Sequence, residues 1–222
     1  MKLRLALLSL ALLAASPLAR PAEPAGRIPL PAARTQGPVS VEAALHQRRS
    51  LRSPADAPLS LAEVGQLCWA AQGVTDDKGH RTAPSARAAY PLQLYLVAGA
   101  VRDLPAGLYR YLPAPHALEL VATGDRRIEL EQRAVGQAWI ARAPAVFVVA
   151  GALAKMSAMG DRGAQFMAVE AGLAAQGFFL QAEALGLGST YVGGFKPREA
   201  REVLALPEGE EVLGVLPVGR RP

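Results

Sequence analysis

The chain has 222 residues, of which 51% are hydrophobic and 19% are charged, and its net charge is +5 at pH 7. This composition is typical of a globular protein with a sizeable core and excludes a disordered chain. The arginines are scattered and no lysine-rich run is present, so nucleic acid is not an expected partner. The single cysteine, Cys68, excludes an internal disulfide, and the three histidines lack the spacing of a metal site.

The first 24 residues are predicted to be a signal peptide. Lys2 and Arg4 precede a short apolar run over residues 5–15, and prolines follow it. This order of charge, apolar run and helix breaker is typical of a secretory leader, and the run is too short to span a bilayer comfortably. We therefore expect an exported, periplasmic protein without a stable membrane anchor.

The rest of the chain divides into a Pro/Ala-rich lead at 25–38 and one domain at 39–219. A capping box, Ser60 with Glu63, opens the second helix, which is expected to stop at a left-handed Gly73. Helices and strands intermix without a regular βαβ repeat, so an α+β fold is expected. The spacing of apolar residues predicts helices over 40–48, 60–72, 125–141, 161–185 and 197–204, and strands over 92–98, 107–111, 117–121, 145–150 and 212–218.

The helix predicted over 161–185 is apolar nearly all round. At about 1.5 Å per residue it would be nearly as long as a small domain is wide. A helix without a polar face must be enclosed on all sides. A subunit interface would enclose it, and a central position inside a monomer is the alternative.

An arginine cluster follows the first helix. In the segment SVEAALHQRRSLR, the residues Arg48, Arg49, Ser50 and Arg52 come close together. Their guanidinium groups carry paired N–H donors, which can bind a phosphate and also contact a second anionic group. A solvated basic helix end is the alternative.

Three further segments offer groups that suit a flat ligand. The loop TAPSARAAYP sets small residues beside prolines, so its backbone amides and a serine hydroxyl stay accessible. The turn YVGGF has no side chains at its two glycines, so the backbone can approach a ring closely. A glutamine late in the helix over 125–141 can hydrogen-bond the edge of a heterocycle. The candidate residues in these segments are Pro84, Ser85, Ala86, Gln137, Gly193 and Gly194.

The order of these segments resembles the nitroreductase family of FMN flavoenzymes. The family's Arg-x-Ser-x-Lys/Arg element matches RRSLR, its Pro-Ser-Ser/Ala loop matches PSA, and its closing Leu-Pro-x-Gly matches LPVG. Within the family, the chain is most similar to the branch that contains the azoline-oxidising dehydrogenases of thiazole- and oxazole-modified peptides. The matching stretches are PLSLAEVGQLCWAAQG, RTAPSARAAYP, GLYRY and GDRG.

The resemblance implies a nitroreductase-like fold, with a central, mainly antiparallel sheet packed by helices and the long helix buried at a homodimer interface. It also implies FMN, bound at that interface. Arg48 and Ser50 would hold the phosphate and ribityl chain, and Arg52 would lie at the N1/C2 edge, where a fixed cation favours the reduced flavin. The glycine turn would approach N5 and O4, the glutamine would bind the pyrimidine edge, and Ser85 would reach the partner's FMN. Because the flavin carries the redox chemistry, no catalytic side chain is expected.

The chain departs from the family pattern in three places. Arg87 replaces the glycine that is common in the PSAG turn of the branch. The Lys-x-Arg phosphate clamp near the C-terminus is missing, and Arg220 or Arg221 is expected to replace it. A lysine, Lys155, lies ahead of GDRG, but the tyrosine that accompanies it in peptide-modifying members is absent.

The sequence thus predicts an FMN-dependent oxidoreductase that transfers hydride or electrons from NAD(P)H or another donor to a small organic acceptor such as a nitroaromatic or a quinone. One alternative is a peptide dehydrogenase that converts azolines to azoles with oxygen. A second alternative is an exported flavin-binding module without turnover.

Overall fold

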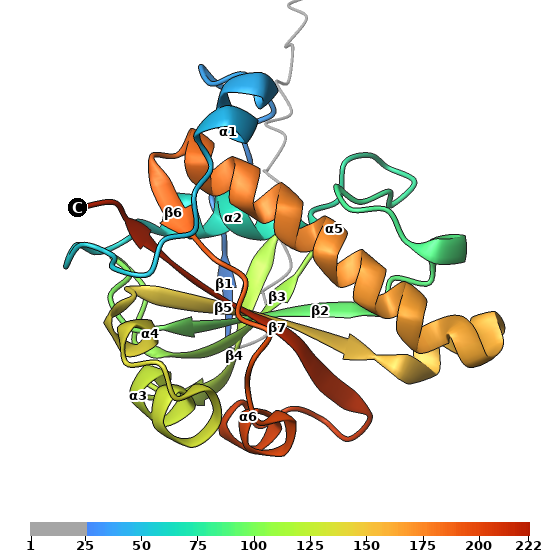
Figure 1. The fold of residues 1–222 in the computed structure, drawn as a ribbon. Coiled ribbons are helices and arrows are strands. Elements are labelled where there is room, and N and C mark those ends of the chain that lie inside the picture. Colours follow the sequence, from blue (N-terminus) through green and yellow to red (C-terminus); the bar gives the residue numbers. More distant parts are fainter. Residues whose placement is uncertain (1–25) are drawn as a thin grey trace, which may run out of the picture.

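The computed structural model describes residues 26–222, and their centre is a seven-stranded sheet (Figure 1). Every ladder between these strands is antiparallel, in the order β1-β4-β3-β2-β5-β7-β6. The predicted signal peptide lies outside the described residues. The strands are β1 (Arg27–Pro29), β2 (Leu92–Ala98), β3 (Gly107–Leu112), β4 (Ala117–Thr123), β5 (Ala145–Ala152), β6 (Leu187–Ser189) and β7 (Glu210–Arg220).

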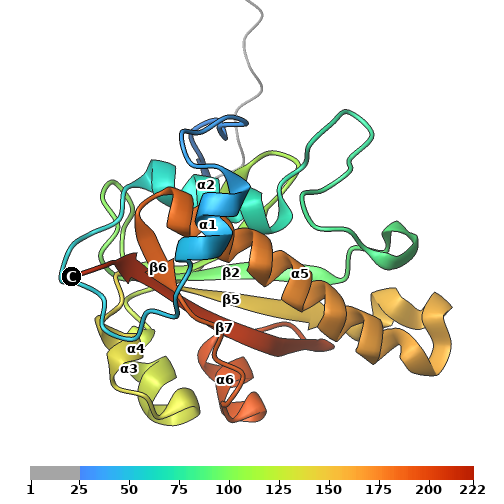
Figure 2. The same ribbon diagram turned by 45° about the horizontal axis from the view of Figure 1, so that its top comes forward.

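Helices cover both faces of the sheet, which confirms the expected α+β architecture (Figures 1 and 2). One face carries α1 (Val41–Gln47), α2 (Leu61–Gln72) and the long α5 (Gly163–Ala184). The opposite face carries α3 (Arg127–Leu130), α4 (Trp139–Arg142) and α6 (Pro197–Val203). Two 3-10 segments, Ala86–Ala88 and Leu153–Arg162, and a π-helical turn, Glu131–Val135, complete the set of helical elements.

Strand β5 lies between two hydrophobic cores, as its uninterrupted apolar run predicts. Side chains alternate between the faces of a strand, so Phe147 points to the α5 side, where its ring meets that of Phe178 at 4.9 Å. Its neighbours Val146 and Val148 pack into the other core, beneath α3 and α6. The strand predicted over 145–150 is therefore confirmed, and it is a central strand of the sheet.

The predicted capping box of α2 is present, but the end of the helix differs from the expectation. Ser60 and Glu63 exchange both hydrogen bonds of the box. Gly73 is extended, with φ −66° and ψ 149°, and is not left-handed. A Cβ atom at this position would lie 2.1 Å from the ring of Trp69. The glycine is therefore required by the close approach of the tryptophan ring.

The prediction of one helix over 125–141 was wrong. The segment breaks into α3, the π-helical turn and α4, and Gly136 between the last two has φ 69°. The Gly136 amide donates to Glu131 O at 2.7 Å, and the left-handed glycine then stops the helix. The amphipathic pattern continues across this break, so periodicity alone did not reveal it.

The Pro/Ala-rich lead contributes a strand that the sequence did not predict. Residues of β1 pair with β4 at the edge of the sheet, and Leu30 N donates to His116 O at 3.0 Å. His116 fixes the lead further, because Nε2 donates to Pro31 O at 3.0 Å while Nδ1 accepts from the Tyr111 hydroxyl at 2.9 Å. In this arrangement the ring is neutral, because a protonated Nδ1 could not accept from the hydroxyl.

The His116 bridge predicts a loss of stability in mild acid. Burial lowers the pKa of His116 below its ordinary 6.5, so the unfolded chain binds a proton that the folded chain resists. The contribution to stability is therefore present above pH 6.5 and is lost as the pH falls through the folded pKa. Thermal unfolding between about pH 8 and pH 5 should show this slope, and His116→Gln should flatten it. Parallel pH profiles of the two proteins would contradict the assignment.

Candidate functional site

The arginine cluster lies along the edge of the sheet, beside β6. Ser50 forms a bridge with Ser189, and Leu51 N donates to Ser189 O at 3.1 Å. The approach is so close that a Cβ atom on Gly188 would lie 2.8 Å from Leu51 Cβ. Gly219 is the cross-strand neighbour of Gly188, and its missing side chain leaves room for the residues that follow the arginine cluster. Two glycines therefore allow the cluster to lie directly against the edge.

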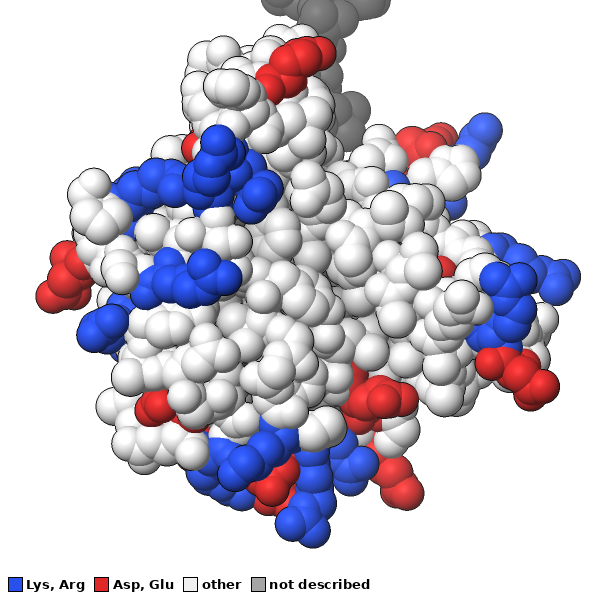
Figure 3. Space-filling model, viewed as in Figure 1, with Lys and Arg blue, Asp and Glu red and all other residues white. Residues whose placement is uncertain are grey.

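The arginines of the cluster have different surroundings. Arg49 Nη1 donates to the carbonyls of His46 and Arg48 at 2.9 and 2.8 Å, so this guanidinium holds the local backbone. The guanidiniums of Arg48 and Arg52 make no hydrogen bond or ion pair with any residue of the described chain. Figure 3 shows basic side chains gathered on the side of the molecule where α1 and the C-terminus lie. Arg48 and Arg52 are thus available to an anion.

The glycine turn lies just beyond β6. Val192 exchanges two backbone hydrogen bonds with Val215 of β7, which fixes the start of the turn. Tyr191 packs its ring where a Cβ atom on Gly214 would otherwise lie, and its hydroxyl donates to the backbone of β7. Apart from its two chain neighbours, no atom of the described residues lies within 4 Å of the position that a Cβ atom would take on Gly194. The backbone there is open to a flat ring.

Gln137 directly follows the segment that contacts this turn, and it lies in a broken helix. Lys196 N donates to Ala134 O at 2.9 Å, which ties the turn to the π-helical segment. Gly136 and Gly194 line the same cavity of about 280 Å³. The side-chain oxygen of Gln137 accepts from Trp139 Nε1 at 3.1 Å, so the amide nitrogen remains for a ligand.

The C-terminal arginines are engaged with carboxylates. Arg220 Nη2 lies 2.9 Å from Glu63, the capping-box residue of α2. Arg221 forms an ion pair with Glu183 of α5. Because both guanidiniums already have acidic partners, the structure does not offer them as the expected replacement for the phosphate clamp.

The loop that carries Pro84, Ser85 and Ala86 lies far from the arginine cluster. Ala86 N donates to Glu170 in the first half of α5, at 2.8 Å, whereas α1 packs near Leu180 in the second half. Ten residues of helix separate these two points, which corresponds to about 15 Å. In Figures 1 and 2, the loop that precedes β2 lies at one position along α5 and helix α1 lies at another. One chain therefore does not bring all predicted site residues together.

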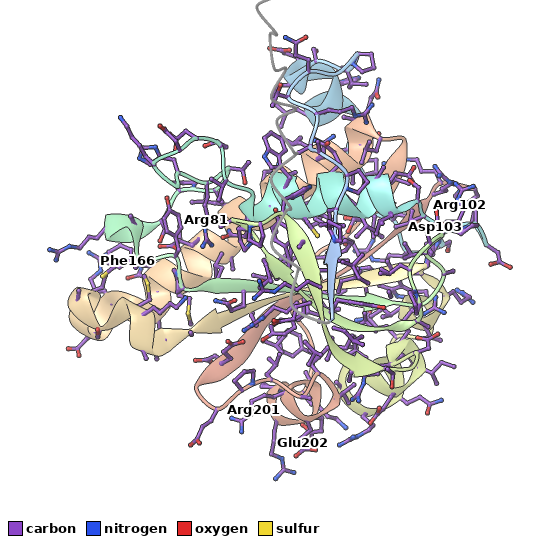
Figure 4. All side chains as sticks on the ribbon, turned by 180° about the vertical axis from the view of Figure 1, so that it is seen from behind. Arg81, Arg102, Asp103, Phe166, Arg201 and Glu202 are labelled. Atoms are coloured by element: carbon purple, nitrogen blue, oxygen red, sulfur yellow. The ribbon has the colours of Figure 1, made fainter. Side chains whose placement is uncertain are left out.

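The backbone of this loop is strained. Arg87 and Ala88 have φ 53° and Tyr90 has φ 44°, all in the left-handed region. Each such residue costs about 1–2 kcal/mol when it is not glycine. The Ser85 hydroxyl accepts from Tyr90 N at 2.8 Å, and the Arg81 guanidinium lies 4.4 Å above the Tyr90 ring (Arg81 is labelled in Figure 4). The surroundings of the loop thus hold a conformation that is locally unfavourable.

Glu170 is the site residue that the sequence reading missed. Its side chain is 5% exposed, and its carboxylate accepts from Ala86 N. Burying a carboxylate is costly unless hydrogen bonds stabilise it, so this residue fixes the loop against α5. In the sequence, the only sign of this role was a single carboxylate within the most apolar stretch of the predicted helix.

Helix α5 is only half covered by its own chain. Its outer face exposes Val169 and Leu173, at 55% and 46%, and α1 beside it exposes Val41 and Leu45, at 62% and 52%. Figure 3 shows a broad surface over α5 that is free of charged side chains. An apolar area of this kind is unusual on a monomer and typical of an interaction surface. The helix is therefore not central within the described chain, which was the alternative considered for it.

The described residues were also compared with the requirements of a membrane span, a metal site and a reactive cysteine. Among residues 26–222, no helix is long and apolar enough to cross a bilayer, and no three His, Cys, Asp or Glu residues are grouped to hold a metal ion. Cys68 is fully buried, and desolvation raises the pKa of its thiol far above the ordinary value. It is a packing residue of α2.

Comparisons with known proteins agree with this fold. The profile of the Nitroreductase family matches residues 45–220. A protein of Methanocaldococcus jannaschii, named as a candidate nitroreductase, is 38% identical over 184 residues, which cover 82% of this chain and 92% of that protein. A solved candidate nitroreductase of Ralstonia eutropha has a TM-score of 0.79 at 32% identity, over 89% of this chain and 90% of the other. A chain of the E. coli microcin synthetase complex shares the fold, with a TM-score of 0.69 at 22% identity, over 93% of this chain and 78% of that chain.

The seven-stranded antiparallel sheet, the long half-covered helix and the arginine cluster at the sheet edge define an α+β domain of the nitroreductase type, a class of oxidoreductases. The chain belongs to the nitroreductase family.

Proposed function

We propose that the protein is a homodimeric, FMN-dependent oxidoreductase that passes electrons from NAD(P)H to a small organic acceptor. One observation carries the proposal. The residues predicted to bind the cofactor lie in two groups at different positions along α5, and the apolar face of α5 lies between them. A second copy of the chain, packed on that face, would bring the loop of one subunit to the arginine cluster of the other.

The residues of the first group fit the chemistry of FMN. Arg48 and Arg52 supply two guanidiniums without acidic partners among residues 26–222, which suits a phosphate and a developing negative charge on the ring. The open backbone at Gly194 suits the close approach of a flat ring. Gln137 keeps an amide nitrogen for the ring edge. When bound there, FMN would supply the hydride chemistry, which needs no nucleophilic side chain from the protein.

The second group would be supplied by the partner subunit. Ser85 and its neighbours would close over the ring from across the interface, and Glu170 would hold them in place through Ala86 N. We further propose that the protein acts after export, since the predicted leader precedes the domain.

Flavin absorption and its bleaching test the proposal and separate it from the alternatives. The protein purified with FMN should be yellow and dimeric, and NAD(P)H under nitrogen should bleach it, with the colour returning when a quinone or nitroaromatic is added. A flavin that NAD(P)H leaves oxidised, but that an azoline peptide reduces and oxygen reoxidises, would favour the peptide dehydrogenase. Bound flavin with neither response would indicate a binding module. A colourless protein that does not take up FMN would refute the proposal.

A further inference from the structure

We propose that Arg87 selects acceptors that carry a negative charge, such as aromatic carboxylates, over neutral acceptors of the same shape. This inference rests on the proposed function, because Arg87 lies in the loop that would close over the ring bound by the other subunit. It adds to that function a substrate class and the residue that recognises it.

The backbone at Arg87 is unusual for an arginine. Its φ of 53° and ψ of 25° place it in the left-handed region, where glycine is the unstrained choice and a long side chain is not. The Ser85 and Glu170 hydrogen bonds on either side keep the turn in this conformation. A bulky, charged residue at a strained position marks a candidate functional position. The side chain itself is exposed at the tip of the turn.

The charge of Arg87 has no acidic partner. Its guanidinium makes no hydrogen bond or ion pair with any residue in the part of the chain that the structure describes. The neighbouring elements add further positive charge, because Lys155 Nζ approaches Tyr90 O of the same loop at 3.4 Å and Arg162 stacks on the Phe166 ring at 4.6 Å. Neither of these cations is paired with a carboxylate among residues 26–222.

Acidic groups around the loop do not neutralise this charge. The buried Glu170 carboxylate is turned inward to Ala86 N and is 5% exposed. Asp161, beside Arg162, forms no ion pair within the described chain. Figure 3 shows basic side chains, with acidic side chains beside them, at the end of the molecule where α5 begins, and Figure 4 places Phe166 at the same end. Arg87, Lys155 and Arg162 outnumber the exposed Asp161, so an anion that approaches the loop meets an excess of positive charge beside an aromatic side chain.

A carboxylate on an aromatic ring matches this arrangement. A guanidinium offers paired donors to a carboxylate, and an adjacent aromatic side chain can contact the ring that bears it. In the reaction considered, a nitroarene, NAD(P)H and a proton give a nitrosoarene, NAD(P)⁺ and water. The hydride of the nicotinamide supplies both electrons, and the carboxylate serves only for recognition.

The test compares para-nitrobenzoate with para-nitrobenzamide, which have the same shape and differ by one charge. The flavin-loaded protein should reduce the benzoate with the higher kcat/KM. In Arg87→Gln the ratio of the two kcat/KM values should fall about tenfold, the effect of one charge-assisted contact. Arg87→Lys should restore part of the ratio. Salt should lower the wild-type ratio and leave that of Arg87→Gln nearly unchanged.

Two controls keep the outcome decisive. Arg201→Gln removes a charge on α6, on the face of the sheet opposite to α5, where Figure 4 labels Arg201, and should leave the ratio unchanged. Arg87→Gly fits the left-handed backbone without strain, so it should fold and show the same fall in the ratio. A ratio that stays the same in Arg87→Gln and Arg87→Gly would overturn the inference and leave the proposed function intact. Failure of the wild type to reduce either nitroarene would overturn both.

Discussion

Replacement of Leu173 by glutamate is expected to convert the protein into a monomer and to abolish its FMN binding. Leu173 is 46% exposed at the middle of the uncovered face of α5, so a glutamate there remains solvated in the single chain. In the dimer the same carboxylate would be buried without a partner, which costs several kcal/mol on each side of the two-fold axis. Because the loop with Ser85 and the arginine cluster would come from different subunits, loss of the dimer should also remove the cofactor.

Sedimentation velocity and FMN titration measure the two effects in one preparation. Ile128→Glu provides the control, since Ile128 is 56% exposed on α3, on the opposite face of the sheet. It should remain dimeric and bind FMN like the wild type. If Leu173→Glu is also dimeric and keeps its FMN affinity, the interface lies elsewhere and the two-subunit site is refuted.

Arg48→Ala is expected to weaken FMN binding by about tenfold to a hundredfold, as the loss of a charged hydrogen bond of about 1.5–3 kcal/mol predicts. The fold should not change, because the Arg48 guanidinium has no partner within residues 26–222 whose hydrogen bond would be lost. The affinity of the variant should also depend less steeply on salt, since one of the charges that attracts the phosphate is gone.

A second arginine distinguishes local recognition from the general charge of the protein. Arg201 lies on α6, across the sheet from the cluster, and Figure 4 labels it there. Arg201→Ala changes the net charge by the same amount as Arg48→Ala and should leave the FMN affinity unchanged. Equal losses in both variants would show that Arg48 does not contact the phosphate.

Some parts of the fold were predictable from local patterns. The capping box of Ser60 and Glu63 marks the start of α2, and the apolar run over 145–150 marks a strand covered on both faces. These features depend on neighbours in sequence, so periodicity and capping chemistry suffice to identify them. The break at Gly136 and the strand β1 depend instead on what packs against them.

The candidate site likewise has features that the sequence predicts and contacts that it does not reveal. The residue types of the arginine cluster and the glycine turn could be identified from their chemistry, but the close approach of Leu51 to Gly188 could not. The engagement of Arg220 by Glu63 was also hidden, because the two residues are 157 positions apart. Glu170 was overlooked since its only partner is the backbone of a loop 84 residues away.

The sequence by itself determined most of the helices and strands, which family the chain resembles, and which residue types are suited to a phosphate and a flat ring, because these depend on spacing and side-chain chemistry. The tertiary structure alone decided that the loop with Ser85 lies away from the arginine cluster, that α5 keeps an uncovered apolar face, and that the C-terminal arginines are already paired. Each of these facts depends on contacts between segments far apart in the chain, and such contacts are set by the packing of the whole core.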